Sequence, residues 1–67
     1  MVKNITKYGI TIKMRLTEIG KSQNWLIEAV RAKTGRFFDS SYLHKIITGR
    51  ENSKTIISAI NEILDIE

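Results

Sequence analysis

Apolar side chains recur every three or four residues along much of this chain, the spacing of helices that bury one face. The pattern is clearest over residues 22–34 and 54–64. Ser22 and Ser53 are suited to cap the first turns, and Thr34-Gly35 is suited to end the earlier helix. The expected buried faces are Trp25, Leu26, Ala29 and Val30 in one helix and Ile56, Ile57, Ile60, Ile63 and Leu64 in the other.

Residues 39–49 predict a shorter helix with two chemically different faces. Asp39 or Ser40 can cap its start, and Gly49 can adopt the left-handed conformation that ends a helix. Leu43, Ile46 and Ile47 form one apolar stripe. The opposite side then carries hydrogen-bonding groups, from Ser40, Ser41, His44, Lys45 and Thr48.

Residues 10–19 allow two interpretations. Ile10, Ile12, Met14 and Leu16 alternate like a strand, whereas Ile12, Leu16 and Ile19 repeat like a helix face. We favour a helix, because the intervening residues are good helix formers, with Thr11 as its cap and Gly20 as its end. Residues 1–9 then form a flexible basic arm with a turn at Tyr8-Gly9.

Aromatic residues also fit a small helical core. Trp25 lies on an apolar stripe, so we interpret it as a core or rim residue and not as a platform for stacking bases. At least one of the adjacent Phe37 and Phe38 is expected to cover the core. Together these elements predict an all-α domain of four to five helices over residues 10–67.

Length and composition narrow the classes of function. A chain of 67 residues supports one modest core, and no catalytic triad, acid pair or phosphate loop is present, so we do not expect an enzyme. With no Cys and one His, we expect neither a metal site nor another cofactor. No membrane-spanning run or signal peptide is visible, which predicts a cytoplasmic protein without a membrane partner.

Charge is unevenly distributed along the chain. Residues 1–36 contain eight Lys or Arg and two Glu, a net charge of +6, whereas residues 37–67 carry −2. The basic half suits phosphate contacts and steering toward a polyanion, although basic surfaces also serve solubility.

These features resemble the λ-repressor-like, Cro-type (XRE) helix-turn-helix family over residues 10–66. Gln23, the pair Leu26-Ile27, the segment from Ser40 to Ile46 and Gly49-Arg50 follow the order of the family motif. The chain also resembles short prophage or mobile-element proteins of Gram-positive bacteria, which share the patterns Trp-Leu-Ile-Glu and Phe-Asp-Ser-Ser-Tyr-Leu. Gln23 lies about six residues farther upstream than the usual spacing, so either the second helix or the turn from Ala32 to Phe38 must be longer than in the ordinary motif; we expect an extended turn between the second and third helices.

The resemblance implies a binding site for double-stranded DNA. Its base-facing residues would be Ser40, Ser41, His44 and Lys45. Its phosphate-facing residues would be Gln23, Arg50, Asn52, Ser53 and Lys54, joined through the extended turn by Lys33 and Arg36. His44 also has a simpler interpretation as a solvated surface residue.

The expected function is therefore sequence-specific DNA binding by a small transcriptional regulator, such as a repressor. One alternative is a protein-interaction module, such as a phage antirepressor or inhibitor, that uses the same helical surface with Phe37, Phe38 or Tyr42. Excisionase-like architectural DNA binding is a third. Ile63, Leu64 and Ile66 either form a homodimer seam or close the core of a monomer.

Overall fold

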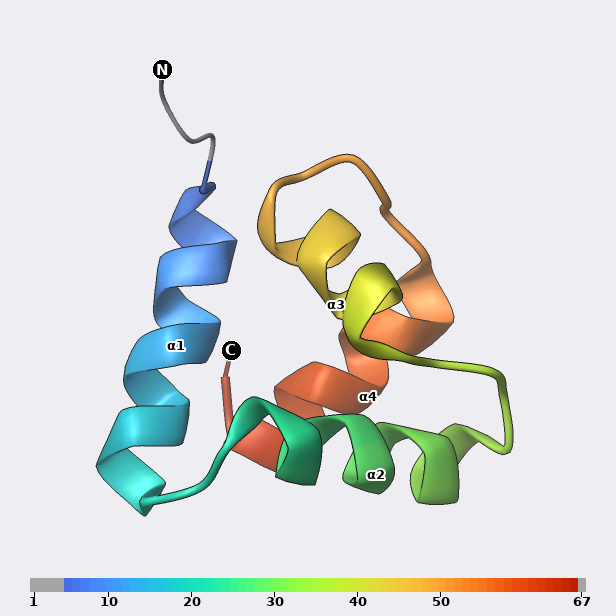
Figure 1. Ribbon diagram of the computed structural model, residues 1–67, viewed down its shortest axis with the longest axis horizontal. Helices are drawn as coiled ribbons and strands as arrows, with labels where there is room; N and C mark the ends of the chain where they lie inside the picture. The colour runs from blue at the N-terminus through green and yellow to red at the C-terminus, as the bar shows by residue number, and fades with distance from the viewer. Residues whose placement is uncertain (1–4, 67) are drawn as a thin grey trace.

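The computed structural model describes residues 5–66 as four α-helices. They are α1 (Lys7–Ile19), α2 (Gln23–Thr34), α3 (Ser40–Ile47) and α4 (Lys54–Leu64). In Figure 1, α1 stands at one side, α2 runs along the lower edge, and α4 crosses the middle of the molecule. Since no strand occurs in residues 5–66, the predicted all-α class is confirmed with four helices.

Side-chain caps set the start of each helix. A hydroxyl or carboxylate accepts a backbone N–H three residues later in all four cases, from Thr6, Ser22, Asp39 and Ser53. Gly20 and Gly35 take the left-handed conformation immediately after α1 and α2. The predicted bounds of α2 and α4 are therefore confirmed, and Asp39 rather than Ser40 caps α3.

The predicted start of α1 is wrong. The helix begins at Lys7, because the Thr6 hydroxyl accepts the Gly9 N–H at 3.0 Å and Thr6, not Thr11, is the cap. Tyr8 and Gly9 thus belong to the first turn of a helix and not to a separate turn. The arm expected over residues 1–9 does not include residues 7–9, and its residues 1–4 lie outside the described residues.

All four helices and one connector residue supply the core. Phe38 is fully buried, so the expectation that one of the two adjacent phenylalanines covers the core is confirmed. Leu64 is also buried, which favours the core alternative at this C-terminal position, and Trp25 lies at the core's edge. The buried apolar residues are Ile12, Leu16, Leu26, Ile27, Val30, Phe38, Leu43, Ile46, Ile47, Ile56, Ala59, Ile60 and Leu64.

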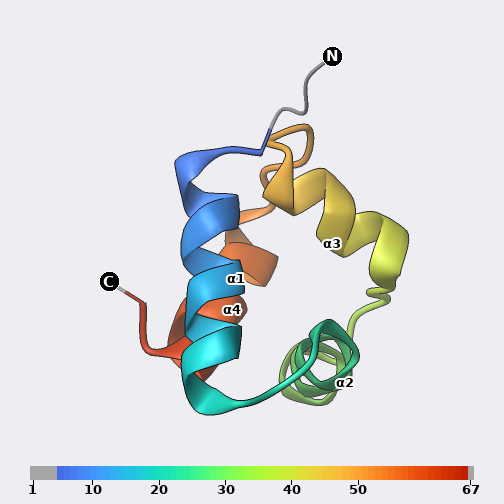
Figure 2. The same cartoon turned by 60° about the vertical axis from the view of Figure 1, so that its left-hand side comes forward.

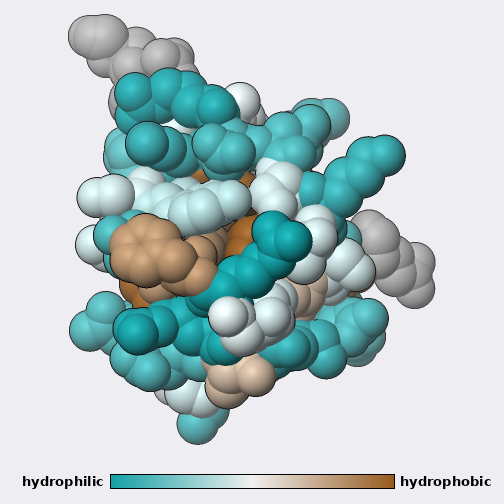
Figure 3. Space-filling view, turned by 90° about the vertical axis from the view of Figure 1, so that its right-hand side faces the viewer, coloured by the Kyte–Doolittle hydropathy of each residue, from teal (hydrophilic) through white to brown (hydrophobic). Residues whose placement is uncertain are grey.

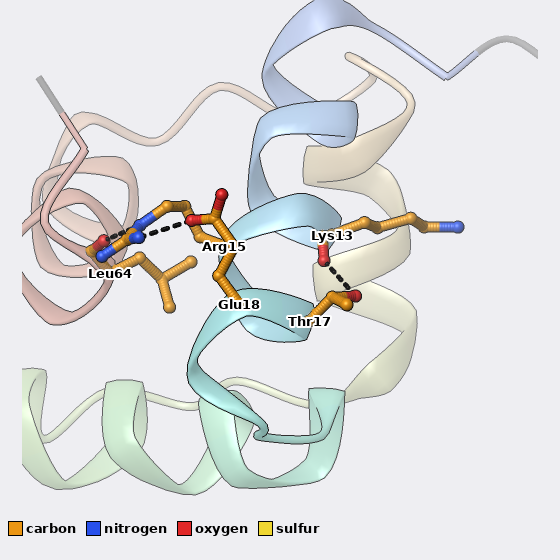
Figure 4. A network of polar contacts seen from close by, with 5 residues as sticks. All are labelled: Lys13, Arg15, Thr17, Glu18 and Leu64. Carbon is orange, nitrogen blue, oxygen red and sulfur yellow. Dashed lines mark hydrogen bonds and ion pairs between the residues drawn. The ribbon is translucent and has the colours of Figure 1, made fainter.

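Two side chains of α1 form hydrogen bonds with α4. The Arg15 guanidinium donates through Nε to the Leu64 carbonyl oxygen at 2.7 Å and through Nη1 to the Glu18 carboxylate at 2.6 Å (Figure 4). The Tyr8 hydroxyl donates to the Asn61 amide oxygen at 2.5 Å. Burial of this phenol raises the pKa of Tyr8 to about 12, because the charged form loses solvation.

None of the helices described here has the length and apolar character needed to cross a membrane. Within residues 5–66, the His, Asp and Glu side chains form no group of three that could hold a metal ion.

Candidate nucleic-acid interface

α3 buries one face and exposes the other, as its sequence predicts. Leu43, Ile46 and Ile47 lie in the core. Because a helix turns by about 100° per residue, these positions direct the opposite face of α3 outward, whereas Tyr42, between the two faces, packs at the edge of the core. The four side chains predicted to face DNA bases are all exposed, namely Ser40, Ser41, His44 and Lys45.

The same four side chains share a surface feature. Together with Arg50 they line an open depression of about 400 Å³, which we call the α3 depression. Arg50 comes from the segment after α3, and the sequence predicts that it faces phosphate. The structure thus brings four predicted base-facing residues and one predicted phosphate-facing residue to one place.

Backbone hydrogen bonds fix Arg50 at the end of α3. Its N–H donates to the Lys45 carbonyl oxygen at 2.8 Å, and the Glu51 N–H donates to the same oxygen at 3.2 Å. The Arg50 Nε also donates to the Thr48 hydroxyl at 3.3 Å. The depression therefore combines two cationic side chains, two hydroxyls and an imidazole, which can donate and accept hydrogen bonds at base edges and phosphates.

The other predicted phosphate-facing residues do not line the α3 depression. Gln23 is exposed at the first residue of α2, and Arg36 follows the opposite end of that helix. Asn52 and Lys54 are exposed beside the start of α4. Ser53 is partly buried, and its hydroxyl accepts the Ile56 N–H at 3.5 Å, so its first role is to cap α4.

Lys33 lies against α4. Its ammonium is 2.8 Å from the Glu62 carboxylate, and both side chains are partly exposed. A phosphate contact by Lys33 would compete with this ion pair.

The residues between α2 and α3 form a second candidate surface that the sequence only partly indicates. Arg31, Arg36 and Phe37 help to line an open depression of about 520 Å³, the connector depression, completed by Glu28, Ala32 and Gly35. Arg31 was not among the predicted site residues, and Phe37 was predicted only as a contact for a protein partner. Their signal in the sequence is the run Arg36-Phe37-Phe38, with Arg31 five residues before Arg36.

Figure 3 faces the side of the molecule that carries the α2–α3 connector in Figure 1. Apolar groups there are surrounded by hydrophilic side chains. Phe37 is 74% exposed, the highest value for a large apolar side chain among the described residues.

α2 and α3 are steeply inclined to each other. In Figure 2, α2 is seen nearly end-on while α3 runs across the picture. The connector between them, Gly35 to Asp39, is five residues long and is anchored by buried Phe38. This arrangement lets α3 expose its polar face while both helices contribute to one core.

Comparisons with known proteins give no relative from which a role can be transferred: no family model, no curated protein and no solved structure matches the chain.

Proposed function

We propose that this protein binds double-stranded DNA, with α3 in the major groove, and acts as a small transcriptional regulator of the λ-repressor-like helix-turn-helix class. The observation that carries the proposal is the α3 depression. Its lining consists of Ser40, Ser41, His44, Lys45 and Arg50, a set of short donors and cations on a helix whose other face is buried.

The arrangement of helices supports this function. A helix whose polar face is exposed can enter the major groove, which is wide enough to admit it. α2 and α3 contact each other at a steep inclination, α4 packs against α2, and α1 packs against α3. The sequence separation between Gln23 and Gly49 is larger than in the family motif, and the extended connector between α2 and α3 is consistent with these additional residues.

Roles within the site follow from side-chain chemistry. Lys45 can donate to the O6 and N7 acceptors of guanine, and the hydroxyls of Ser40 and Ser41 can reach bases or phosphates. Arg50, at the end of α3, is suited to a phosphate. The basic N-terminal half, with a net charge of +6, supports long-range attraction to DNA.

Amide NMR tests the proposal. We would titrate the ¹⁵N-labelled protein with a mixed-sequence duplex at low and moderate salt, since non-specific binding depends on phosphate contacts and weakens with salt. We expect salt-sensitive shifts at residues 40–45 and 50–54, with Gln23 also affected. Absence of shifts, or shifts away from α3, would reject DNA binding through this surface.

A matched pair of variants sharpens the test. Lys45→Gln removes a charge from the α3 depression, whereas Lys13→Gln removes one from α1 and leaves the same net charge. We expect Lys45→Gln to weaken binding by more than about tenfold, the loss associated with a direct base or phosphate contact. Equal effects of the two substitutions would indicate general electrostatic attraction only.

Protein binding is the second candidate function, and the exposure of Phe37 favours it. Aromatic side chains often act as anchors in protein interfaces, and one exposed on a connector is available to a partner. If duplex DNA produces no shifts, an antirepressor or inhibitor that uses Phe37 becomes the better proposal.

A further inference from the structure

The α3 depression and the connector depression are joined by a third one. This middle depression, of about 250 Å³, shares Ser41 and Lys45 with the α3 depression and Phe37 with the connector depression. Its remaining lining residues are Asp39, Tyr42 and Glu51. The three depressions therefore adjoin one another along the surface, from Arg50 at the end of α3 to Arg31 in α2, and we call them together the track.

Phe37 stands at the junction of two of these depressions on a fixed backbone. Phe38, the next residue, is fully buried with its ring centroid 5.0 Å from that of Tyr42. On the other side, the Arg36 N–H donates to the Thr34 hydroxyl at 3.1 Å. Because both neighbours are held, the exposed ring of Phe37 is presented to a partner with little further loss of backbone entropy.

Cationic groups accompany the ring along the track. Arg31 and Arg36 lie on one side of it, and Lys45 lies on the other. Two of the three acids along the track already have partners: Glu28 is 3.8 Å from Arg31, and the Asp39 carboxylate accepts the Tyr42 N–H at 2.9 Å. Glu51 is the remaining acid. With Arg50, the track carries four cationic and three acidic side chains, a net charge of +1. Arg36 and Lys45 flank the exposed ring and are suited to phosphates, while the ring itself is suited to stacking on a base.

We propose that the DNA contact continues past α3 along this track, where Phe37 stacks on an unpaired or unstacked base and Arg36 holds an adjacent phosphate, with Arg31 reaching a second phosphate in exchange for its ion pair with Glu28. This inference rests on the proposed DNA-binding function and adds a local distortion of the duplex beside the segment that α3 reads. Apolar side chains that enter a base step unstack it, and stacking on an aromatic ring repays part of that cost.

The proposal predicts a preference among DNA probes. A duplex with one unpaired adenine already has a base available for stacking, so the protein does not have to open the helix. We expect the protein to bind this bulged duplex about tenfold more tightly than the fully paired duplex of the same sequence, in line with one aromatic–base stack. Phe37→Ala should abolish the preference, and Phe37→Tyr should retain it.

Phe37 can be changed without disturbing the core because its ring is largely exposed. Met14→Ala is the control: Met14 is also a large exposed apolar side chain, but it lies on α1 and lines none of the three depressions of the track. It should leave both affinities unchanged.

Phenylalanine ring signals provide the decisive readout, since the chain has only two phenylalanines. With ¹³C-labelled phenylalanine, the Phe37 ring signals should move upfield when the bulged duplex binds, whereas the buried Phe38 should shift little. Binding that perturbs α3 amides but leaves Phe37 unchanged, with no preference for the bulge, would overturn this inference while preserving the proposed function; Phe37 would then be assigned to a protein partner. Lack of binding to either duplex would reject both.

Discussion

Thr6 holds the carbonyl oxygen of Ile47 with two donors, its hydroxyl at 2.9 Å and its backbone N–H at 3.1 Å. The same hydroxyl accepts the Gly9 N–H and so caps α1. One residue before α1 thereby starts that helix and also binds the last residue of α3, 41 positions along the chain. This junction fixes the C-terminal end of the helix that carries the candidate interface.

Replacement of Thr6 by valine should destabilise the fold. Valine has a similar shape but removes both the helix cap and the hydroxyl bond to Ile47, and we expect a loss of about 1–2 kcal/mol in the free energy of unfolding. Urea denaturation measures it. Thr17→Val is the matched control, because that hydroxyl is exposed and donates only to the Lys13 carbonyl oxygen within α1 (Figure 4). Equal losses for both variants would contradict the role of the junction.

Gly9→Ala should destabilise the protein although alanine is the better helix former. A Cβ atom at position 9 would clash with the carbonyl oxygen of Ile47 in α3. The helices would have to separate, and we expect a cost of about 1–3 kcal/mol, larger than the gain in helix propensity. Thermal unfolding gives the sign directly. A higher melting temperature for Gly9→Ala would disprove the close contact.

Thr6 and Gly9 belong to the part of the fold that local sequence patterns did not predict. The bounds of α2 and α4 follow from local signals, a serine cap and a 3.6-residue apolar period, and the structure confirms them. The start of α1 also has a local signal, the Thr6 cap, but Gly9 in the first turn obscures it, and both Thr6 and Gly9 lie against Ile47. Gly9 resembles a turn residue when only its neighbours in the sequence are considered, whereas its lack of a side chain serves a contact between two helices.

The residues of the candidate site also fall into two groups, those predicted by local periodicity and those that depend on packing between elements. The exposed set on α3 follows from one helix's periodicity, so Ser40, Ser41, His44 and Lys45 could be selected before the structure was known. Two other features depend on how α2, α4 and the connector pack. One is the ion pair between Lys33 and Glu62, and the other is the position of Phe37 at the junction of two depressions. No local pattern specifies those relationships.

Arg15 should contribute more to stability through Leu64 than through Glu18. The bond to the Leu64 carbonyl oxygen satisfies a backbone group at the end of α4, whereas the pair with Glu18 is partly exposed (Figure 4). We expect Arg15→Met to cost about 1–2 kcal/mol in urea denaturation and Glu18→Gln less than about 0.5 kcal/mol. Comparable losses for the two variants would assign the stabilisation to the ion pair.

Tyr8 should make the protein less stable at alkaline pH. Its pKa rises from 10.0 to about 12 because burial disfavours the phenolate, so the folded chain holds the proton more tightly than the unfolded chain. The contribution of this pKa difference to the free energy of unfolding is fully present below pH 10 and is lost as pH rises toward 12. We expect a loss of about 1 kcal/mol after allowance for solvent screening.

Comparison with Tyr8→Phe isolates this effect, since lysine titration over the same range is common to both proteins. The free energy of unfolding, measured by urea denaturation from pH 9 to 11.5, should fall more steeply in the wild type than in the variant. Parallel pH profiles would show that Tyr8 ionises equally easily in the folded and unfolded chains.

Arg36 and Lys33 should differ in their contribution to DNA binding although both are predicted phosphate contacts. Arg36 lines the connector depression beside Phe37, whereas the Lys33 ammonium is engaged by Glu62. Arg36→Gln and Lys33→Gln each remove one positive charge, so their effects on long-range attraction are matched. We expect Arg36→Gln to reduce the slope of log K against log salt by about 1, the signature of one lost phosphate contact, and Lys33→Gln to change it by less than half as much. Fluorescence anisotropy with a labelled duplex at a series of salt concentrations measures both slopes; equal slopes for the two variants would remove Arg36 from the interface.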